Sequence, residues 1–212
     1  MAAQFEPIHF AGGTLGDTRH ICAFFHDAEE EYRVLLPFIK EGLERGEKAF
    51  HVVDPKQRDE HLRRLDSAGI DVADCEKAGR LELADWGVMY FREGDFDQDR
   101  MIALWKETLR AAGQDGFPLT RVVAHMEWAL EERRGVSQLV EYEAKFNLIP
   151  RYRDAVICTY NLSQFKGGVI MDILRTHPMV ILGGVLQVNP FYVPPQEFLL
   201  ELRKREARMA GA

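Results

Sequence analysis

The stretch Cys22 to Asp54, CAFFHDAEEEYRVLLPFIKEGLERGEKAFHVVD, decides the fold class of this chain. It consists of an apolar run of strand length, a polar turn, a segment of helix length and a second apolar run. The middle segment has one apolar face, because its hydrophobic residues recur with the helical period of about 3.6 residues: Tyr32, Leu35, Leu36, Ile39 and Leu43. Strand, helix and strand in this order predict a parallel sheet with the helix packed on one face.

The same alternation continues along the chain. Apolar runs of strand length recur: RLELADW at 80–86, RVVAHM at 121–126 and AVICTY at 155–160. Segments with helical spacing separate or follow them: 97–112, 136–148 and a segment through Ile170 that stops before Pro178. This alternation predicts a three-layer α/β fold, in which a mostly parallel sheet carries helices on both faces.

Three local features refine this outline. Pro37 lies inside the first helical segment, where it should kink the helix or mark a false start, because proline removes one backbone hydrogen bond. The stretch MVILGGVLQVNPFYVPP at 179–195 predicts a C-terminal β-hairpin at the sheet edge, hinged at two adjacent glycines. A closing amphipathic helix is predicted over Glu197–Arg208, where Glu201 and Arg205 stand at i, i+4 and can form an ion pair.

The turn His26 to Glu31 stands where nucleotide-binding proteins carry a phosphate loop. A working loop needs small residues whose backbone N–H groups face the phosphates, and a lysine that reaches the terminal ones. This turn carries four carboxylates, which would repel a triphosphate, so we predict a degenerate phosphate loop without NTPase activity. A structural interpretation also fits, because Asp27 is a favourable N-cap and Glu30 completes a capping box three residues later.

The composition limits the classes of partner. With 212 residues the chain supports one sizeable core, and a net charge of −7 without a basic run argues against direct nucleic-acid binding. No stretch approaches the roughly 20 apolar residues that span a bilayer, so we expect a soluble, cytoplasmic protein without a membrane partner. The three cysteines, Cys22, Cys75 and Cys158, include no C-x-x-C pair, and we expect reduced thiols.

Five segments together resemble one known family: FFHDAEEEYRVLLPFIKEGLERGEKAFHVV, HMEWAL, YEAKFN, ICTYNLSQF and LRTHPMVILGGVLQVNPFYVPPQEFL. They are similar to the MEDS family of sensory domains, found in a dichloromethane-responsive repressor and in methanogen and methylotroph signalling proteins. The resemblance extends from about Arg19 to Leu200, so we predict an N-terminal extension at 1–18 and a single sensory domain at 19–212. The segment GLERGEKAFHVV also resembles, distantly, the opening of KaiC/RecA-like ATPase domains, which implies a RecA/KaiC-like fold that has lost its phosphate loop.

The resemblance implies a non-catalytic sensory or regulatory domain that binds a small molecule. Small hydrocarbon derivatives are the proposed ligands of some members. Such domains are often fused to a DNA-binding or signalling module, for which this sequence has no room. We therefore expect a separate output protein to receive the signal, with Glu197–Arg208 and the acidic face Glu29 to Glu31 as contact surfaces. The sequence identifies no cofactor.

The candidate site follows from the expected sheet. In open parallel sheets, ligands bind beyond the carboxyl ends of the strands. Those ends, together with the histidine before Pro178, give nine candidate ligand-binding residues: Phe25, His26, His51, His125, Glu127, Trp128, Tyr160, Asn161 and His177. Three histidines with Glu127 and Cys158 could form a metal centre. No H-x-x-x-H or C-x-x-C spacing accompanies them, and we predict neither a metal site nor a catalytic residue.

Several of these residues also have a structural interpretation. His51 fits a satisfied core histidine, and Asn161 fits the N-cap of the following helix. Glu127 is costly to bury without a partner, and its ion pair could come from Arg121 or Arg153.

Three polar residues near the later helices have structural interpretations as well. Glu143 and Asn147 stand at i, i+4 on a mostly apolar helix face, where we expect them to cap strand ends, with contact to a ligand as the alternative. His177 is expected to hydrogen-bond the end of its own helix.

Two rival functions remain open. An enzyme could use His125, Glu127 or Cys158, although no nucleophile, base and orienting residue stand at a recognisable spacing. The other rival is a ligand-free interaction module, such as a homodimer that pairs sheet edges or helices. Occupancy of a pocket separates a sensor from such a module, and mutation of Glu127 to Gln separates an enzyme from a binding protein.

Overall fold

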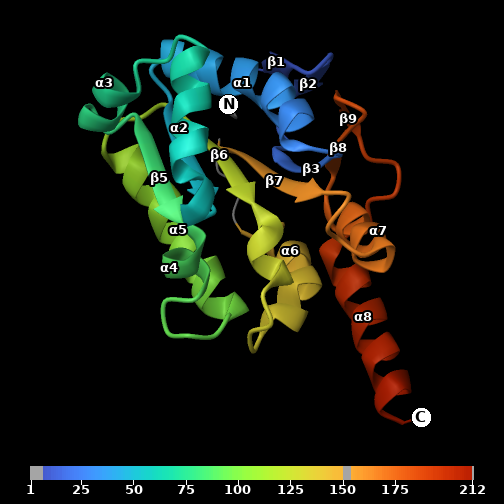
Figure 1. The fold of residues 1–212 in the computed structure, drawn as a ribbon. Helices are drawn as coiled ribbons and strands as arrows, with labels where there is room; N and C mark the ends of the chain where they lie inside the picture. The colour runs from blue at the N-terminus through green and yellow to red at the C-terminus, as the bar shows by residue number, and fades with distance from the viewer. Residues whose placement is uncertain (1–6, 150–153, 212) are drawn as a thin grey trace.

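A computed structural model describes residues 7–149 and 154–211 of the chain. Seven strands form its main sheet: β3 (His20–Phe25), β4 (Lys48–Val53), β5 (Leu81–Asp85), β6 (Thr120–His125), β7 (Ala155–Asn161), β8 (Met179–Leu182) and β9 (Val185–Val188). Their order in space is β5-β4-β6-β7-β3-β8-β9 (Figure 1). The pairs from β5 to β8 are parallel, and β9 returns antiparallel to β8. The predicted mostly parallel sheet and C-terminal hairpin are confirmed.

Helices cover both faces of the sheet (Figure 1). One face carries α1 (Ala28–Glu44), α2 (Arg58–Ser67) and α3 (Val72–Lys77). The other face carries α4 (Trp86–Tyr90), α5 (Gln98–Gln114), α6 (Leu139–Phe146) and α7 (Gly167–Thr176). The last helix, α8 (Pro195–Ala210), buries Phe198 in its first turn and then projects away from the body of the domain.

The period of two along each strand divides the core between the two faces. In β3, Cys22 and Phe24 belong to the core under α5 and α6, whereas Ala23 and Phe25 belong to the core under α1. Because both faces of the sheet are covered, its central strands read as continuous apolar runs without an alternating polar side.

The polar turn before α1 forms the predicted capping box. Asp27 Oδ1 accepts a hydrogen bond from the Glu30 backbone N–H at 2.8 Å, and the His26 backbone N–H donates to Glu30 Oε2 at 2.8 Å. The helix continues through Pro37, so the false-start interpretation is wrong. Its buried apolar face holds it on the sheet despite the missing hydrogen bond.

The sequence pattern gives no prediction for α2, α3, α4 or the hairpin of β1 (Ile8–Phe10) and β2 (Gly13–Leu15). This hairpin packs on β9, where the Leu186 backbone N–H donates to the Ala11 carbonyl oxygen at 2.8 Å. A side chain at Gly13 would collide with the Leu186 backbone. The hairpin lies within the predicted extension at 1–18, and the boundary after residue 18 stays a prediction.

The C-terminal helix is bound to α7 by ion pairs. Glu201 pairs with Arg175 at 2.6 Å, and Arg205 pairs with Asp172 at 2.9 Å. The expected pair between Glu201 and Arg205 is therefore replaced, because oppositely charged partners on α7 lie within reach of both side chains. In the part of the chain that the structure describes, no helix has the length and apolar character needed to cross a membrane.

Candidate functional site

A pocket of about 590 Å³ opens at the carboxyl ends of β4, β5 and β6. Asp54 directly follows β4, and Asp85 and His125 are the last residues of β5 and β6, so three strand ends contribute polar side chains to one place. Glu127 joins them from the 3₁₀-helix Met126–Leu130. The volume falls in the range of roughly 300–1,000 Å³ that is typical of small-molecule pockets, and this edge is where open parallel sheets bind ligands.

Two of the acidic groups in this pocket already have structural roles. Asp54 Oδ1 accepts from the Lys56 backbone N–H at 2.9 Å, and Asp85 Oδ1 accepts from the Gly87 backbone N–H at 2.6 Å. Both carboxylates cap the short helical turns that follow their strands. Of the four polar groups at these strand ends, His125 and Glu127 remain for a ligand.

Glu127 is mostly buried, and burial raises the pKa of its carboxyl group. The neighbouring His125 opposes this rise, the negative charge of Glu31 adds to it, and a hydrogen bond from the Asn161 backbone lowers the pKa again. The expected ion pair with Arg121 is wrong, because Arg121 pairs with Glu47 instead. Arg153 lies outside the described residues.

Beneath the pocket, on the α1 and α2 face of the sheet, lies a chain of histidines. We name it the α1–α2 cluster: Glu31, Tyr32, His51, His61 and His125. The Tyr32 hydroxyl lies 2.7 Å from His61 Nδ1, and His61 Nε2 lies 2.9 Å from His51 Nδ1. His125 Nε2 faces Glu31 Oε1 at 3.3 Å. Burial lowers the pKa of His51 to about 3 and that of His61 to about 2, with neighbouring histidines adding to both shifts.

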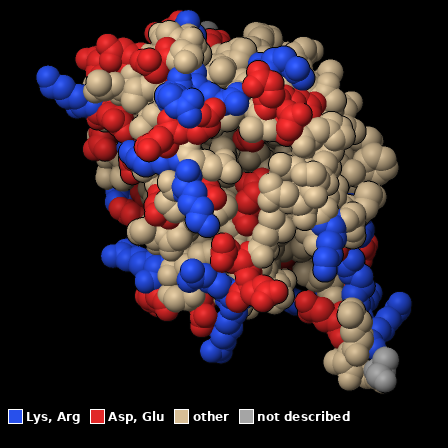
Figure 2. Space-filling view, in the orientation of Figure 1, with Lys and Arg blue, Asp and Glu red and all other residues tan. Residues whose placement is uncertain are grey.

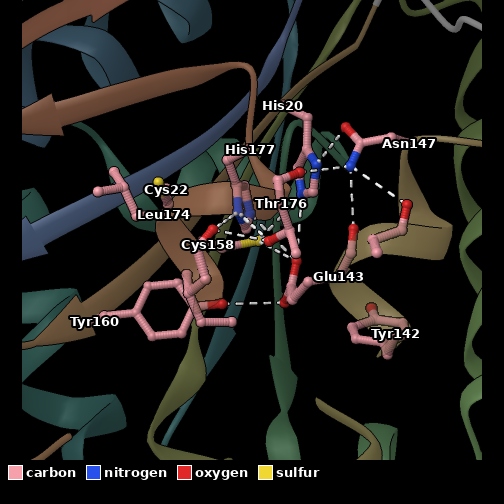
Figure 3. Close-up of polar contacts among 12 residues, drawn as sticks. His20, Cys22, Tyr142, Glu143, Asn147, Cys158, Tyr160, Leu174, Thr176 and His177 are labelled. Carbon is pink, nitrogen blue, oxygen red and sulfur yellow. Dashed lines mark hydrogen bonds and ion pairs between the residues drawn. The ribbon is translucent and has the colours of Figure 1, made fainter. Parts of the chain in front are cut away.

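A second buried polar group lies on the opposite face of the sheet, and two of the predicted residues are part of it or touch it (Figure 3). We name it the α6–α7 cluster: His20, Glu143, Cys158 and His177. Their potential ligand atoms all lie within 4.8 Å of one another. The Tyr160 hydroxyl donates to Glu143 Oε1 at 3.1 Å.

Burial governs the titration of the α6–α7 cluster. Burial lowers the pKa of His20 and raises that of the Cys158 thiol well above its usual range. For Glu143, burial alone would raise the pKa, but the neighbouring imidazoles of His177 and His20 outweigh it and lower that pKa.

The nine predicted ligand-binding residues therefore do not form one site. His125 and Glu127 line the pocket, His51 lies beneath it, and Tyr160 and His177 lie at the α6–α7 cluster on the other face. The other four have separate positions: Phe25 and Trp128 are buried in the two cores, His26 is exposed, and Asn161 Oδ1 accepts from the Ser163 backbone N–H at 2.9 Å.

Of the three polar residues near the later helices, one makes the structural contact expected from the sequence and two do not. His177 Nδ1 lies 2.9 Å from the Ile173 carbonyl oxygen of its own helix, as expected. Asn147 was expected to cap a strand, but its Nδ2 donates to the Thr176 carbonyl oxygen at 2.7 Å, at the end of α7. Glu143 caps no strand either, because its carboxylate faces the two histidines of its cluster.

Sequence reasoning missed His20, His61 and Glu31 as members of the two clusters. His20 precedes an apolar run, and His61 lies on a helix without a strong apolar stripe. The adjacency of β3 and β7, which brings His20 to Cys158, depends on strand order and has no signal in the local sequence.

Comparison with known proteins identifies the family of this chain and a solved structure with a similar fold. The family model described as MEDS, the methanogen/methylotroph, DcmR sensory domain, matches residues 19–178. The transcriptional repressor DcmR of Methylorubrum extorquens is 26% identical over 169 residues, which cover 79% of this chain and 61% of the repressor. The chain thus matches less than two thirds of that relative's length.

The crystal structure of a KaiC-like protein from the hyperthermophilic archaeon Pyrococcus horikoshii is also similar. It has 17% sequence identity and a TM-score of 0.56, covering 81% of this chain and 73% of that one. At this identity the likeness concerns the fold alone, and it confirms the expected KaiC-like fold.

Proposed function

The chain belongs to the MEDS family of sensory domains, and we propose that it senses a small organic molecule bound in the pocket beyond β4, β5 and β6. Binding occurs without turnover, and a separate output protein receives the signal. The observation that carries this proposal is the convergence of His125 and Glu127 at the carboxyl edge of the sheet, where open parallel sheets bind ligands.

The lining of the pocket favours a neutral or amine-bearing ligand. Glu127 offers a half-buried acceptor, whereas Trp86, Val88 and Leu130 offer apolar surface. Four carboxylates line this pocket against one lysine and one arginine, which disfavours phosphates: Asp54, Asp85, Glu127 and Glu131. A small hydrocarbon derivative with one hydroxyl or amine group matches this combination.

The enzyme that the sequence leaves open loses support from the geometry. Cys158 contacts His20 and Glu143 on one face of the sheet, whereas His125 contacts Glu31 on the other. A nucleophile, a base and an orienting residue drawn from His125, Glu127 and Cys158 therefore cannot act on one substrate atom.

The output surface is proposed at α8 and at the acidic start of α1. Beyond Phe198, α8 projects from the domain and most of its side chains are exposed (Figure 1). Glu31, at the start of α1, faces His125 in the pocket wall, so a ligand there can shift the first turn of this helix. On the face shown in Figure 2, basic side chains are interspersed with acidic ones, which suits a protein partner better than DNA phosphates.

The test is native mass spectrometry of the chain purified from its own cells, followed by titration with small alcohols, amines and other hydrocarbon derivatives. Glu127→Gln should weaken binding of any ligand found by about 10- to 100-fold, because a hydrogen bond to a charged acceptor is lost. Glu132→Gln removes the same charge from an exposed neighbour that does not line the pocket, and it should leave binding unchanged. If no panel compound binds and no small organic mass is retained, the sensor proposal is wrong.

A further inference from the structure

The α6–α7 cluster unites four side chains from four different elements. His20 starts β3, Glu143 lies on α6, Cys158 lies within β7, and His177 follows α7. Their exposed fractions are 8%, 0%, 5% and 0%, so the cluster is closed to bulk water except at His20. Ionisable side chains are rarely buried unless they are paired or bind a metal.

Four of the six separations among the ligand atoms match tetrahedral coordination. Ligands bound 2.0–2.3 Å from a tetrahedral metal stand roughly 3.3–3.6 Å apart. Glu143 Oε2 lies 3.4 Å from His20 Nε2 and 3.2 Å from His177 Nε2. Cys158 Sγ lies 3.7 Å from His20 Nε2 and 3.8 Å from Glu143 Oε2. These four separations lie near those of a tetrahedral site, and the other two are within 4.8 Å. No sequence motif brings the four residues together.

Neighbouring groups fix which ring nitrogen of each histidine carries its proton. Asn147 Nδ2 donates to the Thr176 carbonyl oxygen at 2.7 Å, so Asn147 Oδ1, 3.0 Å from His20 Nδ1, must accept. His177 Nδ1 lies 2.9 Å from the Ile173 carbonyl oxygen, which can only accept. A ring that carries a single proton therefore has it on Nδ1 and directs an Nε2 lone pair toward Glu143. Metal-binding histidines are commonly oriented in this way.

In this orientation neither ring donates into the centre of the cluster, where the Cys158 thiol makes a long contact with Glu143 Oε2 at 3.8 Å. His177 Nε2 is fully buried and has no hydrogen-bond partner of acceptable geometry, although Glu143 Oε2 is nearby. Tyr160 donates to the other carboxylate oxygen, Oε1, and leaves Oε2 facing the two rings. Two ring lone pairs, a carboxylate oxygen and a sulfur atom therefore converge on one point (Figure 3).

We propose that His20, Glu143, Cys158 and His177 bind one divalent transition metal ion, with Zn²⁺ as the ion that suits the site best. Two nitrogens, one sulfur and one oxygen form a mixed ligand set that Zn²⁺ accepts readily in tetrahedral geometry. With Cys158 as thiolate and Glu143 as carboxylate, the ion makes the buried site electrically neutral. The thiol proton leaves to solvent when the metal binds.

A second pocket provides the entry path. It has a volume of about 210 Å³ and lies at the amino ends of β3 and β7, with His20 and Asn147 in its wall. The metal site is thus reached from the sheet edge opposite the proposed sensory pocket. With four protein ligands and no open position, the ion would bind β3, β7, α6 and α7 together.

The test is titration of Co²⁺ into chelator-dialysed full-length chain, followed by displacement with Zn²⁺. We expect one Co²⁺ per chain, with the visible bands of tetrahedral Co²⁺ and a near-ultraviolet thiolate-to-metal band. Zn²⁺ should abolish both and raise the melting temperature. Cys158→Ser should remove the thiolate band and weaken Zn²⁺ binding by more than about 100-fold.

The matched control is Cys22→Ser. Cys22 is aligned with Cys158 in the neighbouring strand and is equally buried on the same face, but its thiol faces the Met179 carbonyl oxygen. This variant should retain the thiolate band and full affinity. Glu127→Gln should retain both as well, so failure of the sensory pocket and failure of the metal site are distinguishable. A chain that binds no Co²⁺, or whose Cys158→Ser variant binds it unchanged, overturns the proposal.

Discussion

The two faces of one sheet bury histidines in opposite ways. In the α1–α2 cluster, both ring nitrogens of His61 find partners in Tyr32 and His51, and among these two rings only His51 Nε2 has none. In the α6–α7 cluster, the two rings bond outward through Nδ1 and direct Nε2 toward a shared carboxylate. A buried histidine pair alone therefore indicates no site.

The position of the carboxylate makes the difference. Glu143 is completely buried between its two histidines, whereas the Glu31 side chain remains 16% exposed at the edge of the α1–α2 cluster. A fully buried negative charge needs a compensating cation, and a partly exposed one can rely on water. The α6–α7 cluster thus requires an ion or a proton, whereas the Glu31 side chain of the α1–α2 cluster keeps contact with solvent.

Arg121 extends this comparison, because it is the cation that the protein itself supplies to a buried carboxylate, that of Glu47. Its Nε lies 2.5 Å from Glu47 Oε2, and both residues are buried. We expect Arg121→Met to lower the free energy of unfolding by about 3–5 kcal/mol, because Glu47 loses its buried cation. The loss of unfolding free energy should lie at the lower end of this range, since Arg45 Nε still contacts Glu47 Oε1 at 3.2 Å.

Urea unfolding measures this cost, and Arg110→Met is its control. Arg110 pairs with Glu107 on the exposed surface of α5, and its replacement should change stability by less than about 0.5 kcal/mol. Equal costs for the two substitutions would mean that burial does not set the need for a cation in this fold.

The α1–α2 cluster should make stability depend on acid. Unfolded histidines bind protons near pH 6.5, whereas folded His51 and His61 resist protonation down to about 3 and about 2. Between these values the unfolded chain holds more protons, so stability is complete above pH 6.5 and is lost as the pH falls. Each group contributes about 1.4 kcal/mol per pH unit.

Unfolding of metal-free chain between pH 4 and 6 tests this slope. His51→Gln should reduce the slope by about 1.4 kcal/mol per pH unit, because one of the two resisting groups is removed. His9→Gln should not change it, since His9 is exposed. A His51→Gln variant with the full wild-type slope would contradict the neutral, buried state of the cluster.

The smallest expected effect separates the metal site from ordinary packing. Tyr160→Phe removes the hydrogen bond to Glu143 Oε1 and should weaken Zn²⁺ binding about tenfold, because this contact orients the carboxylate. Tyr142→Phe removes the partner of Trp105 Nε1 from the same core without touching the Glu143 carboxylate. It should lower stability by about 1 kcal/mol and leave metal affinity unchanged. Equal Zn²⁺ affinity in the two variants would show that Tyr160 does not position a ligand.

The sequence predicts the fold better than the site for a physical reason. Strands and long helices are determined by local hydrophobic period, and β3, α1 and β4 follow from one stretch of the chain. The short α2 has few apolar residues and is stabilised mainly by tertiary packing, so its pattern gave no prediction, and His61 on it was missed.

The clusters depend on strand order, which the local pattern does not contain. Cys158 and His20 lie on neighbouring strands although 138 residues separate them. The sequence does predict that His125 and Glu127 lie at the carboxyl edge of the sheet. His125 ends β6, and Glu127 lies in the 3₁₀-helix that follows it. The sequence pattern does not show that the Tyr160 side chain lies on the α6–α7 face, away from the pocket. A shift of one position along a strand moves a side chain to the other face of the sheet.

The most direct test of the contrast between the two faces is an anomalous difference map from crystals grown with Zn²⁺ and measured at the zinc absorption edge. We predict one strong peak per chain, within coordination distance of His20 Nε2, His177 Nε2, Cys158 Sγ and Glu143 Oε2. The α1–α2 cluster should show none. An empty α6–α7 cluster, or a peak among His51, His61 and His125 instead, would contradict the distinction between the two clusters.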